Sequence, residues 1–193
     1  MRWDDLFGDL EAQLDAAEGA SVDAEVADRT RRESALVTLV DRLSGSRGGR
    51  VGLQVLGAGR VDGRLLEVTG QWLLLADDRG AEVLVPLAAV QAVSALSTAS
   101  DPAAAPAAPD RPAGRLNARL GLGVALRAIA RDRAPVVVRL TGGGTVEGTL
   151  ERVGADFVEL TEHPAGEVRP RRAAAGAVRT VPFGAVALVR SGR

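Results

Sequence analysis

The chain has 193 residues, with 24 basic against 25 acidic side chains, so it lacks the strongly basic profile of a histone-like nucleic-acid coat. It contains no cysteine, which excludes disulfide scaffolds, thiolate zinc sites and cysteine nucleophiles. It also contains no tyrosine, no lysine and one histidine, so we expect neither an enzyme, nor a cofactor, nor a metal site. The arginine-only, Ala/Gly/Val-rich composition indicates a GC-rich coding sequence of the actinobacterial kind.

An amphipathic helix is predicted within residues 1–20. Its apolar side chains recur at helical spacing and form one stripe: Trp3, Leu6, Phe7, Leu10 and Leu14. This stripe either docks a partner protein or packs on the chain's own domain. The segment is acidic and lacks the apolar core of a signal peptide, and no run is long enough for a membrane span, so we expect a cytoplasmic protein.

Residues 21–96 combine a predicted helix with five short strands. Leu36, Val40 and Leu43 lie at helical spacing, and alternating apolar residues predict strands, the first two near residues 51–55 and 61–65. Gly57 and Gly59 lie between those two strands. Because a strand and not a helix follows them, they favour a hairpin turn over a phosphate loop.

An Ala/Pro-rich linker without apolar periodicity is predicted over residues 97–113. A second region follows over residues 114–193, and it begins with a predicted helix that carries Leu122, Leu126 and Ile129. This region ends with strand patterns like those of the first.

The second region is a copy of the first. Residues 136–160 match residues 51–75 at an offset of 85, with eight identities in 25 positions. A later block around Val181-Pro182 matches the block around Val85-Pro86 at an offset of 96. The sequence therefore predicts a tandem duplication whose second copy carries an extra, basic insertion, residues 161–177.

The segment Gly143 to Val153, with the two later Val-Pro-x-x-Ala-Val blocks, resembles the Sm-like (LSm) family, which includes bacterial Hfq. The resemblance implies a mostly β fold with helices: the N-terminal amphipathic helix, then two helix-capped, five-stranded barrels of the Sm-like or SH3-like kind in tandem. It also implies self-association through strand edges, since family members pair their fourth and fifth strands in rings.

The chain departs from the family's RNA-contact motifs. RNA-binding members carry an Asp and an Asn where this chain has Thr69 and Leu73 in the first copy, and Gly154 and Val158 in the second. The resemblance therefore does not imply the family's base-stacking pocket.

Positive charge is concentrated in the second half. Residues 1–100 hold 10 arginines and 16 acidic residues, whereas residues 101–193 hold 14 arginines and 9 acidic residues. This asymmetry is explained either by contact with an RNA backbone or by head-to-tail pairing of acidic and basic halves. The candidate RNA-binding residues lie in the insertion and on the predicted second helix: Arg169, Arg171, Arg172, Arg115 and Arg119.

We therefore expect a non-catalytic binding or scaffold protein that contacts RNA or a ribonucleoprotein through its basic second half. The alternative is a protein-interaction module that docks a partner through the N-terminal helix or free barrel edges, without nucleic acid. His163, in the insertion, has no ligating or catalytic residue near it in sequence, so we expect a solvated loop side chain.

Overall fold

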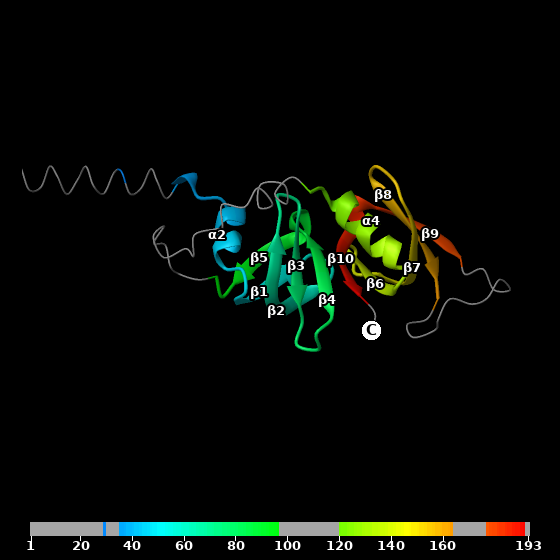
Figure 1. The fold of residues 1–193 in the computed structure, drawn as a ribbon, viewed down its shortest axis with the longest axis horizontal. Coiled ribbons are helices and arrows are strands. Elements are labelled where there is room, and N and C mark those ends of the chain that lie inside the picture. The colour runs from blue at the N-terminus through cyan, green and yellow to red at the C-terminus, as the bar shows by residue number, and fades with distance from the viewer. Residues whose placement is uncertain (1–28, 30–34, 97–119, 164–176, 192–193) are drawn as a thin grey trace, which may run out of the picture. The chain divides into compact units, whose positions relative to one another are not determined.

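A computed structural model describes residue 29 and residues 35–96, 120–163 and 177–191 (Figure 1). The chain divides into two units, residues 1–39 and residues 40–193, and the second unit contains all the strands of the described residues. The predicted N-terminal helix and linker, and most of the basic insertion, lie outside the described residues.

The first half of the sheet follows a short helix, α2 (Leu39–Gly45). Its strands are β1 (Arg50–Val55), β2 (Gly59–Val68), β3 (Trp72–Ala76), β4 (Glu82–Pro86) and, after the 3₁₀ turn η1 (Leu87–Ala89), β5 (Val90–Ser94). Apolar side chains alternate along β2 and point into the core at Val61 and Leu65, as the sequence pattern predicts.

The second half repeats this order after helix α4 (Leu122–Asp132). Its strands are β6 (Pro135–Leu140), β7 (Thr145–Val153), β8 (Phe157–Glu162), β9 (Val178–Pro182) and, after η2 (Phe183–Ala185), β10 (Val186–Ser191). The first and third strands are repeated at an offset of 85, and the fourth and fifth begin again at an offset of 96. The sequence repeat is thus also a repeat of structural elements.

The ten strands form one open antiparallel sheet in the order β5-β1-β2-β3-β4-β10-β6-β7-β8-β9. The prediction of an N-terminal helix followed by two separate helix-capped, five-stranded barrels in tandem is therefore wrong. β4 of the first half pairs directly with β10 of the second, and the structure describes two helices beside this sheet, α2 and α4. The physical reason lies in β4 and β10, which are largely apolar on both faces and satisfy their backbone groups by pairing with each other.

Buried side chains form two hydrophobic cores, one for each half of the sheet. Each core also includes residues from the opposite half. The first core is built around Leu43, Leu65 and Leu75 and also contains Ala187 and Leu188 of β10. The second core contains two residues of the first half beside its own, namely Trp72 and Leu84. Because each fully buried leucine contributes about 1.5–3 kcal/mol, this exchange of side chains makes the halves stabilise each other.

The first hairpin turns of the two halves also touch. Gly57, between β1 and β2, has a positive φ of 70°, and a Cβ added there would lie 2.3 Å from the carbonyl oxygen of Leu140. Only glycine tolerates both the left-handed backbone and this close approach. The counterpart Gly142 has open space around it.

Candidate functional site: the junction and the free edges of the sheet

None of the side chains predicted from sequence to bind a partner lies in the described residues. This holds for the candidate RNA-binding arginines, Arg115, Arg119, Arg169, Arg171 and Arg172, and for the N-terminal stripe, Trp3, Leu6, Phe7, Leu10 and Leu14. The site is therefore built from the sheet itself.

The pairing of β4 with β10, which we call the junction, is short and largely apolar, with one charged residue, Arg190, opposite Val83. Leu84 lies opposite Val189, and these side chains are 3% and 2% exposed. The Ser191 hydroxyl extends the contact, since it donates to the Glu82 carbonyl (3.3 Å) and accepts the Glu82 N–H (3.1 Å). Such buried apolar pairing is typical of a permanent interface.

A second contact joins the halves at the turn before β3. The Trp72 indole N–H donates to the Leu120 carbonyl over 2.9 Å, and the Leu122 N–H donates to Oε1 of Gln71 over 3.0 Å. The Gln71–Trp72 turn of the first half therefore holds the start of α4. The sequence pattern predicted the apolar face of α4 but not which residues would cover it.

The outermost strands, β5 and β9, each have one neighbour among the described residues, β1 and β8 respectively. Phe183 N–H donates to the Asp156 carbonyl, and Glu162 N–H donates to the Ala177 carbonyl. Because hydrogen-bonding direction alternates along a strand, the backbone of Thr180 faces away from β8. We call the outer sides of β5 and β9 the free edges.

Each free edge has the geometry of one side of the junction but a more polar sequence. On β9, Arg179 and Thr180 stand where β4 has Val83 and Leu84. On β5, Gln91 stands where β10 has the fully buried Ala187. Arg179, Thr180 and Gln91 are all exposed. Charged and polar side chains on an edge strand disfavour pairing with a further strand.

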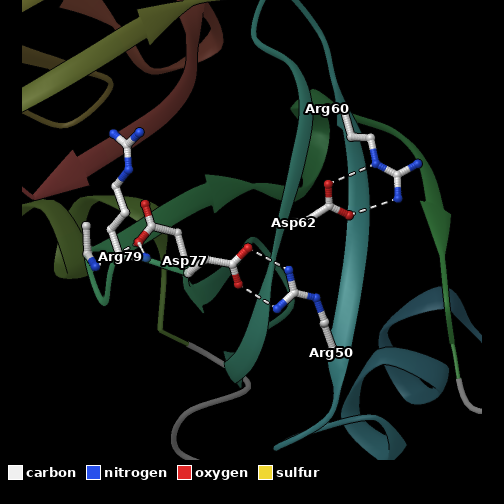
Figure 2. A network of polar contacts seen from close by, with 7 residues as sticks. Arg50, Arg60, Asp62, Asp77 and Arg79 are labelled. Carbon is white, nitrogen blue, oxygen red and sulfur yellow. Dashed lines mark hydrogen bonds and ion pairs between the residues drawn. The ribbon is translucent and has the colours of Figure 1, made fainter.

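Exposed ion pairs lie on the surface of the first half of the sheet, and Figure 2 shows two of them. Arg50 donates to both carboxylate oxygens of Asp78 (2.5 and 2.7 Å), and Arg60 donates to both oxygens of Asp62 (2.9 Å each). These hydrogen bonds hold the pKa of both carboxyl groups below its ordinary value. All four side chains are solvated, so the pairs contribute little to stability.

His163 is not the solvated loop residue that the sequence predicted. Its side chain is 7% exposed, and its Nε2 lies 2.8 Å from the Thr149 hydroxyl oxygen on β7. Its backbone N–H donates to the Glu147 carbonyl. The buried imidazole ring therefore packs directly after the end of β8, where the insertion begins. The loop-like composition around Pro164 gave no indication of this burial.

The comparisons with known proteins do not assign the chain to a family. No protein-family model matches it, and no curated protein and no solved structure matches it either. In the part of the chain that the structure describes, no helix is long and apolar enough to cross a membrane. The same residues contain no group of three His, Asp or Glu side chains that could hold a metal ion.

Proposed function

We propose that this chain is a non-catalytic scaffold protein of the cytoplasm that binds protein chains, copies of itself included, through the free edges of its sheet. One observation carries this proposal: at the junction an edge of the same geometry already holds another strand, β4 against β10. The corresponding edges β9 and β5 retain outward-facing backbone groups. An extended segment that adds to such an edge gains main-chain hydrogen bonds whatever its side chains.

A labelled peptide tests the proposal directly. The probe is a synthetic peptide with the sequence of residues 185–191, which contains β10, the strand that fills the β4 edge. Because β9 stands in the place of β4, we expect fluorescence polarisation to show saturable binding of this peptide to the full chain. The same peptide with proline at the position of Val189 loses the outward N–H and should not bind.

Two substitutions at Thr180 locate the binding. Thr180→Pro removes one outward N–H of β9 and breaks no hydrogen bond to β8, so it should abolish peptide binding. Thr180→Val keeps the N–H and the branched shape, and should bind as the wild type does. The proposal fails if the peptide does not bind, or if Thr180→Pro binds it equally well.

Contact with an RNA backbone is the second candidate. Arg127, Arg131 and Arg133 lie exposed on and after α4, in the basic half of the chain, and the Sm-like resemblance of Gly143 to Val153 supports the same reading. Binding of this kind is electrostatic and weakens steeply as salt rises.

Filter binding of a labelled single-stranded RNA at several salt concentrations tests this candidate. Replacing Arg169, Arg171 and Arg172 together with alanine should abolish binding and flatten the salt dependence. Unchanged affinity of the triple variant would exclude the insertion as the site.

A further inference from the structure

An ion pair crosses the junction between the two halves. Nη1 of Arg190 on β10 lies 3.5 Å from Oδ2 of Asp77, which directly follows β3. The Asp77 side chain is 9% exposed, and its Oδ1 accepts the N–H groups of Arg79 and Ala81 over 2.9 Å each. Because its own turn holds this carboxylate in place, the strand that pairs with β4 meets a positioned negative charge.

The equivalent carboxylate of the second half is Glu162, which follows Asp77 at the repeat offset of 85. Its partner lies on the outermost strand, because Nε of Arg179 on β9 forms an ion pair with Oε1 of Glu162. Arg179 stands where β4 has the fully buried Val83. The positive charge that the added strand supplies at the junction is therefore supplied at the free edge by β9 itself.

This exchange changes which strand the edge favours. At the junction Arg190 lies opposite Val83, so a strand paired with β9 in the same way places its equivalent residue opposite Arg179. Side chains directly opposed in an antiparallel pair have Cβ atoms about 4.5–5.5 Å apart, where opposite charges stabilise the pair and like charges destabilise it. The β9 edge therefore disfavours an arginine at this position and favours a carboxylate.

Arg179 keeps the capacity to bind a second carboxylate. Its side chain is 55% exposed, against 31% for Glu162. A guanidinium carries five N–H donors, so one ion pair does not exhaust them. Glu162 repels an incoming carboxylate, but it lies on β8, one strand farther from the added segment than Arg179. The attraction to Arg179 is therefore the stronger of the two.

We propose that the β9 edge selects extended segments of partner proteins that carry an aspartate or glutamate opposite Arg179. The inference rests on the proposed function and names the class of segment that this edge takes. Such a segment differs from β10, which fills the equivalent edge of β4, chiefly in having an acidic residue where β10 has Arg190.

Three labelled peptides test this selection by fluorescence polarisation on the full chain. One peptide has the sequence of residues 185–191, and the other two carry Arg190→Gln or Arg190→Glu. We expect the affinity to rise in this order as repulsion by Arg179 is first removed and then replaced by attraction. The glutamate peptide should bind at least about threefold more tightly than the unchanged peptide.

Variants of the full chain assign the preference to Arg179. Arg179→Val recreates the junction, with a valine beside a carboxylate that has lost its arginine, and should reverse the order so that the unchanged peptide binds best. Glu162→Gln removes the competing negative charge and should increase the preference for the glutamate peptide. The matched control is Arg131→Glu, which changes an exposed arginine of α4 and should leave the wild-type order.

Circular dichroism and sedimentation velocity must show that each variant is folded and does not self-associate more than the wild type. Arg179→Gln keeps the edge polar, and replaces Arg179→Val if the apolar edge causes association. With this variant the preference for the glutamate peptide should disappear.

The outcomes separate the two proposals. If the three peptides bind the wild type equally, or if the Arg179 variants keep the wild-type order, selection by Arg179 is wrong while binding at the edge stands. If none of the three peptides binds, both proposals are wrong.

Discussion

The junction and the free edges are equivalent strands of the repeat, and they differ at a few positions: Val83 and Leu84 against Arg179 and Thr180, and Ala187 against Gln91. β4 and β10 present Leu84, Val189 and Leu188 to each other, all less than 5% exposed. β9 presents Thr180 and β5 presents Gln91, both exposed. The comparison teaches that a few side chains separate a buried strand pairing from an exposed edge on equivalent strands, and on our proposal these side chains also make binding at the exposed edge reversible.

Removing the leucine at the junction should have the largest effect on stability. Leu84→Ala deletes a buried side chain shared by the two halves, and should lower the free energy of unfolding by about 2–4 kcal/mol. The matched change at the free edge, Thr180→Ala, should alter it by less than about 0.5 kcal/mol. Urea denaturation of both variants checks the contrast, and equal losses would contradict it.

A methyl group at the first hairpin turn should have the next largest effect. Gly57→Ala forces a Cβ against the Leu140 carbonyl at a positive φ, and should cost about 1–3 kcal/mol. Its repeat counterpart, Gly142→Ala, meets nothing within 4 Å and should be nearly neutral. Thermal unfolding of the pair measures the difference, and a neutral Gly57→Ala would show that the two turns do not touch.

Trp72 of the first half and Phe157 of the second half occupy equivalent positions in the repeat. Exchanging them tests whether this position distinguishes the junction from the free edge. Trp72→Phe gives the first half the residue that the second half has at this position, Phe157. It removes the hydrogen bond to Leu120 and should lower the free energy of unfolding by about 1 kcal/mol. Phe157→Trp makes the reverse change, and should strengthen association between copies. Chemical denaturation tests the first variant and sedimentation velocity the second, and weaker association of Phe157→Trp would count against the equivalence of the two positions.

The smallest expected effect is on how the stability of the fold depends on acidic pH. The pKa of Asp62 and of Asp78 is lower in the fold than the ordinary 3.8, so their ion pairs stabilise the protein above that pH. This stability is lost as the pH falls through the lowered values. Asp78→Asn should remove part of the acid dependence, and so should added salt. Unfolding followed from neutral to acidic pH checks both effects, and an unchanged slope in Asp78→Asn would contradict them.

The sequence pattern was sufficient for the strands and their repetition but not for their assembly. Alternating residues such as Val51, Leu53 and Val55 locate β1 because alternation depends only on which face is buried. The pairing of β4 with β10 joins residues about 100 positions apart, and no local pattern encodes it. One signal was available: the continuous apolar runs of β4 and β10, against polar counterparts in β9 and β5, are typical of central and edge strands.

The candidate site was less accessible to sequence reasoning than the fold. The arginines of the insertion stood out by charge, and they lie outside the described residues. Leu122 was predicted on the apolar face of a helix, but apolar spacing shows only that a side chain is buried and not that Trp72 of the other half covers it. His163 was wrongly predicted to be solvated, because the residue it contacts, Thr149, lies 14 positions away on β7 and no local pattern links the two.

Amide hydrogen exchange of the full chain, resolved by residue and repeated at increasing protein concentration, tests the central claim most directly. The amides of Leu84 and Val189 at the junction should be protected at every concentration, because their partners belong to the same chain. Those of Thr180 and Val93 should exchange rapidly in dilute solution and gain protection as the concentration rises. If Thr180 and Val93 exchange equally at all concentrations and with the residue 185–191 peptide present, the free edges bind no strand and the account is wrong.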